Sequence, residues 1–156
     1  MNTLRNMITG LCVLTFVATS PLTVSAGQHA SSSKVEYLNH AQVAVAFAQG
    51  ETLVQGSAGR AVYRVLTARR DHPGEVEFHK LDTDIMYIIN GTATFVTGGT
   101  ILDAKNTAPN EIRGKSIENG TPHQLGPGDI IIVPNGVPHW FKEVQPPFTY
   151  LVMKVR

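Results

Sequence analysis

The stretch Gly128-Asp-Ile-Ile-Ile-Val-Pro134-Asn-Gly136-Val-Pro-His139 decides the fold of this chain. It begins at a glycine turn, continues as an apolar strand and stops at Pro134, which cannot extend a ladder of backbone hydrogen bonds. Gly136 then supplies a second tight turn, and His139 begins the next strand. The two turns fold the new strand back into the domain, so His139 is directed into an interior that is otherwise apolar.

A second pattern, Glu77-x-His79-x4-Asp84-x6-Gly91, lies upstream of the first. Residues two apart on a strand share one face, so Glu77 and His79 point the same way. Asp84 begins the returning strand and can meet them across the hairpin. Two imidazoles with one or two carboxylates form a suitable ligand set for Fe(II), Mn(II), Zn(II) or similar ions.

These two patterns resemble the two motifs of the cupin superfamily. The stretch from Gly128 to His139 matches the second motif, G-x5-P-x-G-x2-H, at all four fixed positions. The upstream pattern is similar to the first motif but departs from it twice, because Glu77 replaces a histidine and Asp84 replaces the usual glutamate. The resemblance covers about residues 61–155. It implies an all-β fold, a cupin-type double-stranded β-helix (jelly-roll) barrel, preceded here by a short N-terminal helix.

The resemblance also implies a metal site inside the barrel. We expect Glu77, His79, Asp84 and His139 to bind one divalent ion, which is iron, manganese, zinc, copper or nickel. The carboxylates and the absence of sulfur ligands favour iron or manganese. Asp82 lies in the same turn as Asp84 and competes with it for the assignment. The alternative is a metal-free pocket in which the histidines pair with the carboxylates and orient a small molecule.

The first 26 residues have the pattern of a signal peptide. Arg5 supplies the positive charge, residues 7–19 are almost uninterruptedly apolar, and Val24-Ser25-Ala26 offers small residues for cleavage after Ala26. We therefore expect a periplasmic or secreted protein, with an uncleaved N-terminal anchor as the alternative. The only cysteine, Cys12, is lost with this leader, so the mature domain contains no disulfide.

Removal of the leader leaves 130 of the 156 residues, which is enough for one domain and too few for two. The mature chain keeps all 12 acidic residues and, of the 13 basic residues, loses only Arg5, so its net charge is 12 minus 12, or zero. Nucleic acids and acidic membrane surfaces attract proteins with a basic excess. We therefore expect no nucleic-acid partner and no membrane partner once the leader is removed.

The mature chain divides into a segment of residues 27–58 and a barrel domain of residues 59–156. In the first part, Asn39 can cap a short helix from His40 to Gln49, although the alternating apolar residues there also fit a strand. The second part consists of short apolar runs separated by turn signals such as Asn90-Gly91, which is typical of an all-β barrel. The runs cover residues 61–68, 76–79, 84–90, 92–97, 129–133 and 148–155.

Residues 101–125 show no clear periodicity and predict a long loop, either disordered or placed as a lid over the barrel mouth. Glu111 and Arg113 within this stretch are expected to be solvated, and the alternatives are that they pair with each other or contact a substrate from the lid. His123 is expected on a surface hairpin, with a position at the mouth as the alternative. The adjacent Arg69 and Arg70 point to opposite faces of their strand, so one of them can line the mouth. The aromatic residues expected in the core or at a dimer contact are Tyr87, Phe95, Trp140 and Phe141.

The function that these features indicate is the binding of a small organic molecule by a metal ion in the barrel. Open coordination positions beside two histidines and a carboxylate favour a metal-dependent oxygenase or isomerase. Glu77 is the candidate catalytic base if it does not bind the metal. The alternative is a non-catalytic periplasmic or secreted binding protein for a small ligand or a metal. The apolar segment from Phe148 to Val155 suits the interface of a homodimer.

Overall fold

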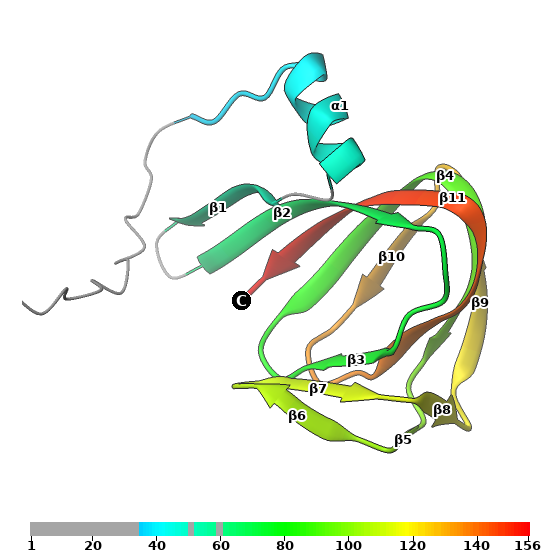
Figure 1. Ribbon diagram of the computed structural model, residues 1–156. Coiled ribbons are helices and arrows are strands. Elements are labelled where there is room, and N and C mark those ends of the chain that lie inside the picture. Colours follow the sequence, from blue (N-terminus) through cyan, green and yellow to red (C-terminus); the bar gives the residue numbers. More distant parts are fainter. Residues whose placement is uncertain (1–34, 50–51, 59–60) are drawn as a thin grey trace, which may run out of the picture.

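The structure of the protein, a computed structural model, describes residues 35–49, 52–58 and 61–156. These residues form a β-barrel with one short helix, so the predicted all-β fold class is confirmed (Figure 1). The predicted leader, residues 1–26, lies outside the described residues. The elements are α1 (His40–Gln49), β1 (Thr52–Ala58), β2 (Ala61–Arg70), β3 (Val76–His79), β4 (Thr83–Thr97), β5 (Thr100–Leu102), β6 (Lys105–Ala108), β7 (Glu111–Gly114), β8 (Ser116–Glu118), β9 (Thr121–Leu125), β10 (Ile130–Val133) and β11 (His139–Val155).

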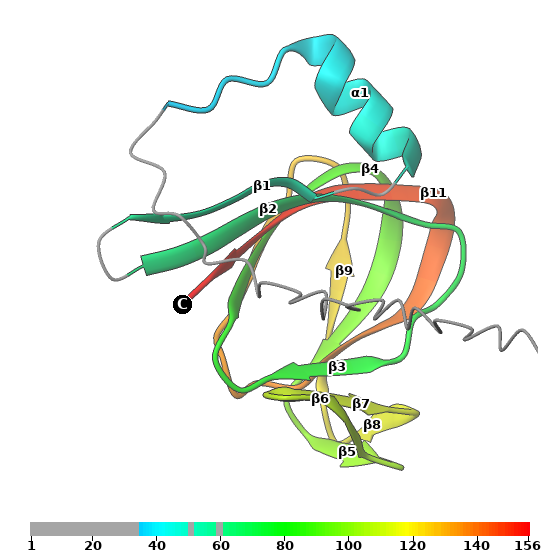
Figure 2. The same ribbon diagram turned by 60° about the vertical axis from the view of Figure 1, so that its left-hand side comes forward.

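Strands β4 and β11 organise the barrel. The barrel has two opposed faces, and each of these long strands runs through both of them. Residues 148–155 of β11 pair with β2, and residues 149–155 pair with residues 83–90 of β4. Residues 139–145 of β11 pair with residues 92–97 of β4. All pairings are antiparallel. Within one nine-stranded sheet, β1, β2, β11, β4 and β10 thus form one face and β6, β7, β3, β11, β4 and β9 form the other (Figure 2).

The dipeptide Asn90-Gly91 does not end a strand, contrary to the sequence prediction. β4 continues through it and bends, while the register of β11 shifts between Gln145 and Thr149 on the opposite side. Gly91 has a φ angle of +78°, and a Cβ atom on it would lie 2.7 Å from the backbone oxygen of Pro147. Only glycine tolerates this combination, so the glycine that signals a hairpin turn serves here as a bend within a long strand.

The interior of the barrel is filled by aromatic and branched side chains from alternate strand positions. Ile88, Phe95 and Phe148 are completely buried. The rings of Phe95 and Phe141 lie 4.6 Å apart between centroids, and those of Phe141 and Phe148 lie 5.4 Å apart, both in tilted arrangements. The core positions predicted for Phe95 and Phe141 are therefore confirmed. Of the two positions predicted for Tyr87, core or dimer contact, the core is wrong, because Tyr87 faces outward and is 44% exposed.

Helix α1 has the predicted bounds and covers the outer side of β2 (Figures 1 and 2). Asn39 and Gln42 cap it reciprocally, since the side-chain oxygen of each accepts a hydrogen bond from the backbone N–H of the other. The hydroxyl of Thr67 donates to the backbone oxygen of Ala46, which attaches the helix to the barrel. Within the described ranges, no helix has the length and apolarity needed to cross a membrane.

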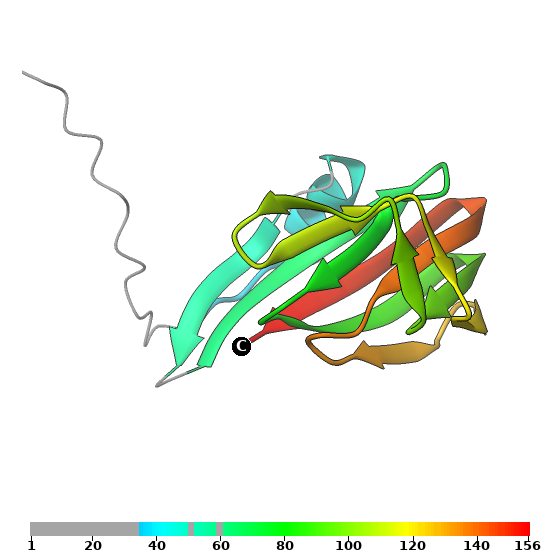
Figure 3. The ribbon, with the colours of Figure 1, turned by 90° about the horizontal axis from the view of Figure 1, so that it is seen from below.

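Residues 101–125 are not the long loop that their sequence predicts. They form most of five short strands, and two of these, β6 and β7, lie beside β3 at one side of the barrel (Figure 3). The strands are three to five residues long and carry polar residues on their exposed sides, so they lack a strong alternating pattern. Strand β1, which pairs with β2, was likewise not anticipated.

Candidate metal centre

The two sequence motifs meet at one end of the barrel interior. Glu77 and His79 lie on β3, Asp84 lies near the start of β4, and His139 is the first residue of β11. His139 is paired directly with Glu77 in the ladder between β11 and β3, and the rings of His79 and His139 lie 5.2 Å apart between centroids. His79, Asp84 and His139 are buried, and Glu77 is partly buried. All four predicted site residues are therefore brought together.

Both histidines direct Nε2 toward the pocket. Nδ1 of His139 lies 3.2 Å from the backbone oxygen of Val137, and Nδ1 of His79 lies 2.6 Å from Oε2 of Glu111. An imidazole nitrogen that faces such an acceptor carries a ring proton, so Nε2 is the nitrogen that each ring offers to a ligand in the pocket. This arrangement is the one that orients histidine for metal binding.

The donor atoms of these residues are spaced as ligands of a single ion are. One ligand atom each from Glu77, His79 and His139 lies within 4.8 Å of the other two. Asp84 adds a carboxylate whose Oδ2 is 3.4 Å from Nε2 of His79 and 3.7 Å from Nε2 of His139. Two imidazoles and two carboxylates provide the mixed nitrogen and oxygen donors that Fe(II), Mn(II) and Zn(II) accept. The residues present therefore fit a divalent metal ion.

Glu77 is held as an anion by two arginines. Arg70 donates from Nη2 to Oε1 over 2.9 Å, and Nη1 of Arg113 lies 2.6 Å from Oε2. Burial alone would raise the pKa of the Glu77 carboxyl, but the hydrogen bond with His79 and the charge of Arg113 hold that pKa well below its usual range. Glu77 is thus fully charged at neutral pH and is a weak proton acceptor.

Asp84, and not Asp82, is the aspartate of the site. Its two carboxylate oxygens accept hydrogen bonds of 2.8 and 2.6 Å from Nζ of Lys154. Burial works to raise the pKa of Asp84, but hydrogen bonds from His79 and Lys154 outweigh it and lower that pKa. Asp82 instead forms ion pairs with Arg64 and Arg156. The ambiguity between the two aspartates is thereby resolved.

The two imidazoles differ in their electrostatic environment. Burial lowers the pKa of His139, which keeps that ring neutral. Burial also acts to lower the pKa of His79, but hydrogen bonds to Asp84 and Glu77 prevail and raise it to about 9. Nζ of Lys154 lies 2.8 Å from Nε2 of His79. Only one proton fits between two nitrogens at that distance, so His79 and Lys154 cannot each direct an N–H at the other.

Lys154 was not predicted at the site, and Arg70, Glu111 and Arg113 were predicted only as residues of the barrel mouth or of the 101–125 loop. Glu111 and Arg113 are not solvated as expected, because β7 pairs with β3 residue for residue and brings them beside His79 and Glu77. The prediction that Arg69 and Arg70 face opposite ways is confirmed: Arg69 is paired with Asp71 at the surface, and Arg70 faces the interior. A signal for Lys154 was present, since strand alternation places it on the same face as Tyr150 and Val152.

Two cavities adjoin these residues. The inner one has a volume of about 40 Å³ and is bordered by Glu77, Asp84, His139 and Lys154. The outer one, at the mouth, has a volume of about 350 Å³ and is bordered by His79, Glu111, Lys154 and three arginines. The inner cavity has room for an ion or a water molecule, whereas an organic molecule requires the space at the mouth.

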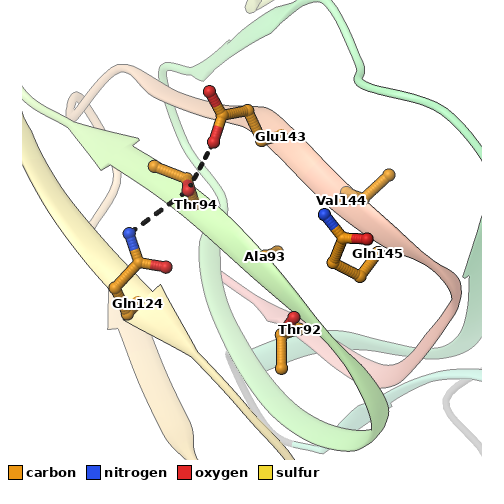
Figure 4. Close-up of a pocket in the computed structure, with 7 residues that line it drawn as sticks. All are labelled: Thr92, Ala93, Thr94, Gln124, Glu143, Val144 and Gln145. Carbon is orange, nitrogen blue, oxygen red and sulfur yellow. Dashed lines mark hydrogen bonds between the residues drawn. The ribbon is translucent and has the colours of Figure 1, made fainter.

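A separate hollow of about 250 Å³ lies on the outer surface of β4, β9 and β11 (Figure 4). Its polar lining is linked by hydrogen bonds, in which Thr94 donates to Glu143 and accepts from Gln124. It contains no histidine and none of the predicted site residues. His123, on β9, bonds to the hydroxyl of Thr97 and also lies outside the candidate metal centre.

Comparison with known families identifies the chain. The family model named Cupin matches residues 41–156. The chain belongs to the cupin family. The match confirms the resemblance of the two motifs of this cupin to those of the family. No curated protein matches it.

Solved structures similar to this cupin have low sequence identity to it. Hydroquinone 1,2-dioxygenase from Sphingomonas sp. TTNP3, solved with 4-hydroxybenzoate bound, is 14% identical, with a TM-score of 0.45 over 60% of this chain and 59% of its own. The Streptomyces protein PAC13 with uridine is 13% identical, with a TM-score of 0.45 over 78% and 80%. An oxalate oxidase is 14% identical, with a TM-score of 0.40 over 61% and 41%. This cupin spans less than two thirds of the length of the dioxygenase and of the oxidase, and similarity at this level says nothing about substrate or reaction.

Proposed function

We propose that this protein is an exported cupin that binds one divalent metal ion and holds a small organic molecule at the barrel mouth. The observation that carries the proposal is the orientation of His79 and His139, whose Nε2 atoms both face two buried or partly buried carboxylates. His79, His139 and Glu77 would hold the ion, with Asp84 as a fourth candidate ligand. A bound ion of this kind supplies Lewis-acid or oxygen-activating chemistry.

The environment of Glu77 supports a role as an anionic ligand over a role as a general base. A general base works best when its pKa lies near the working pH, whereas the hydrogen bond with His79 and the charge of Arg113 hold the pKa of Glu77 well below its usual range. Arg70 and Arg113 fix the position of the carboxylate. Glu77 therefore contributes negative charge and a rigid oxygen donor to the proposed centre.

Elemental analysis of the purified protein tests the metal proposal. We expect about one metal ion per chain in the wild-type protein and almost none in the double variant His79→Ala, His139→Ala. The matched control is His123→Ala, which removes a histidine outside the centre and should retain the ion. A metal content that is low in all three proteins, or that is the same in the double variant as in the wild type, would refute the proposal.

A non-catalytic binding protein is the second candidate, and the size of the inner cavity favours it. A volume of about 40 Å³ beside Glu77, Asp84 and His139 admits an ion but leaves no room for an organic substrate next to it. An oxygenase or isomerase of this kind would have to act on a molecule placed at the mouth. Oxygen-consumption assays with catechols, flavonols and diketones test for the oxygenase, and analysis of the recovered compounds for isomers tests for the isomerase. Turnover in either assay supports the enzyme, and metal binding without turnover in both supports the binder.

We further propose a homodimer formed through the outer face of β4 and β10. The interface predicted at residues 148–155 is wrong, because Phe148, Tyr150 and Val152 are buried in the core. On the outer face of β4 and β10, Tyr87, Ile89, Ile130 and Ile132 are all exposed, between 44% and 65%, and Ile130 is paired with Tyr87 across the two strands. Isolated apolar residues are common on protein surfaces, but a row of four across two strands is typical of an interface. Sedimentation should give a dimer for the wild type and a monomer for Ile130→Glu.

Export of the mature chain is also a proposal, supported by the pattern of the first 26 residues. N-terminal sequencing of the protein recovered from periplasm or medium should begin at Gly27. A chain that retains residues 1–26 would indicate an anchored protein instead.

A further inference from the structure

The ammonium group of Lys154 lies within the candidate metal centre. It donates hydrogen bonds of 2.8 and 2.6 Å to the carboxylate of Asp84 and lies 2.8 Å from Nε2 of His79. The Lys154 side chain is 14% exposed, and its two partners are almost completely buried. A cation supplied by the chain itself is thus held by two of the four residues that would hold a metal ion.

The contacts of Lys154 use the same electron pairs that a metal ion would need. A metal ion would need the single electron pair on Nε2 of His79, and Nζ of Lys154 lies directly against that nitrogen. Asp84 has two oxygens, and both accept from Nζ. A divalent ion and an ammonium a few ångströms apart also repel each other strongly in a partly dehydrated pocket. The two cations therefore exclude each other from this position.

The ammonium group of Lys154 has a second position available, in the cavity at the mouth. It borders both cavities, the inner one beside Glu77 and His139 and the larger one at the mouth beside Glu111. Rotation about the bonds of its flexible four-carbon stem moves Nζ between the two without a change in the backbone of β11. The volume of about 350 Å³ at the mouth accommodates the displaced ammonium.

All buried polar side-chain atoms of the described residues already have hydrogen-bond partners. At the centre, Lys154 is the hydrogen-bond partner of Asp84 and contacts Nε2 of His79. A metal ion that enters must replace these bonds as well as the ammonium, and the free energy of that replacement is subtracted from the free energy of metal binding. A metal ion therefore binds more weakly to the intact protein than it would bind to the same ligands without Lys154.

We infer that Lys154 is a built-in competitor of the metal ion: its ammonium and the metal occupy the inner cavity alternately, and metal entry moves the lysine to the mouth. This inference rests on the proposed metal-binding function. It makes Lys154 the residue that sets metal affinity and exchange, in addition to the ligands themselves. The side chain at position 154, more than the ligand set, then determines whether the centre is permanently loaded or exchanges its metal.

Metal titration of three variants at one fixed pH tests the inference. The protein is stripped with a chelator and titrated with Mn²⁺, and separately with Zn²⁺, by calorimetry or chelator competition. Lys154→Met keeps the length of the apolar stem and removes the charge, so we expect metal affinity at least tenfold above that of the wild type with unchanged stoichiometry. Lys154→Arg keeps a cation and should bind as weakly as the wild type. The matched control is Lys142→Met, which removes an exposed lysine from the same strand and should leave the affinity unchanged.

Thermal melting provides a second measurement that also verifies folding. Without metal, Lys154→Met should melt at a lower temperature than the wild type, because Asp84 loses its counterion. Excess metal should then raise the melting temperature of Lys154→Met by more than that of the wild type.

The possible failures are distinguishable. If the wild type and Lys154→Met bind metal with equal affinity, or if the variant binds more weakly, competition is refuted while the proposed metal-binding function stands. If folded wild type and folded Lys154→Met both bind no metal, the proposed function itself is refuted, and the inference with it.

Discussion

Two adjoining regions of the barrel interior are built from the same strands but held together by different forces. The aromatic core, formed by Phe95, Phe141, Phe148 and Tyr150, lies directly against the charged pocket, formed by Glu77, His79, Asp84, His139 and Lys154. On β11 the change from one to the other takes two residues, from His139 to Phe141. The core is stabilised by burial of apolar surface, whereas in the pocket each buried charge needs a partner of opposite charge.

The two regions therefore tolerate different kinds of substitution. A residue of the core can be exchanged only for one of similar volume, because the interior is close-packed. A residue of the pocket is constrained by charge, because the loss of one partner leaves the other uncompensated. Substitutions in the two regions should therefore differ in their size and in their dependence on pH.

The largest effect is expected for Phe95→Ala in the aromatic core. Phe95 is completely buried, so its truncation should leave a cavity and lower the free energy of unfolding by about 3–5 kcal/mol. Urea denaturation followed by circular dichroism measures the change. Tyr37→Ala is the control, because Tyr37 is 81% exposed and its loss should cost less than about 0.5 kcal/mol. A loss below about 1 kcal/mol for Phe95→Ala would contradict a close-packed core.

A smaller effect is expected for Glu77→Gln in the charged pocket. The substitution keeps the shape of the side chain but leaves Arg70 and Arg113 without their shared carboxylate. Because these groups are partly exposed, we expect a loss of about 2 kcal/mol in the metal-free protein, less than for a fully buried pair. Glu118→Gln, at an exposed position, should be nearly neutral. An unchanged free energy of unfolding for Glu77→Gln would show that the two arginines do not depend on it.

The effect of Glu77→Gln should itself shrink in acid. The pKa of Glu77 is lower in the folded protein than its ordinary value of 4.5, so the folded state binds its proton less readily than the unfolded state. The stability that Glu77 contributes is therefore complete above about pH 4.5 and is lost as the pH falls below it. Denaturation of wild type and variant at pH 6 and pH 3 should show their difference in free energy decreasing. A difference that grows toward pH 3 would show that folding raises the pKa of Glu77 instead of lowering it.

The smallest effect is expected for Arg69→Ala, and its neighbour provides the contrast. Arg69 forms an ion pair with Asp71 in which both side chains are about half exposed, so its loss should change stability by less than about 0.5 kcal/mol. Arg70 instead bonds to Glu77 and Tyr150 and lies 4.5 Å above the ring of Phe141. Arg70→Ala should cost about 2 kcal/mol, since it joins the pocket to the core. Equal melting temperatures for Arg69→Ala and Arg70→Ala would contradict the distinction between a surface ion pair and a charge held in the pocket.

Features determined by local sequence were predicted well. Helix α1 ends and begins where its cap and apolar spacing indicate, and β3 has the predicted bounds Val76–His79. His139 is placed by two turns and a strand that lie within twelve residues of one another. The four predicted site residues meet because each motif fixes its own side chains on one strand face.

Features that depend on distant parts of the chain were not predicted. Lys154 bonds to His79, which lies 75 positions away, and no local pattern links the two. Glu111 reaches the same histidine from a stretch whose short polar strands lack periodicity. The bend at Gly91 resembles a hairpin turn in sequence, and only the opposing segment of β11 shows that the strand continues.

The sharing of β4 and β11 between both faces also has a mechanical consequence. The two faces cannot slide past each other, because any relative displacement would have to stretch two continuous backbones. The hairpin of β6 and β7 lies outside this frame. Within the sheet it is joined through β3 alone, by four pairs of residues, and it carries Glu111 and Arg113. This part of the pocket wall is therefore attached to the sheet along one edge only.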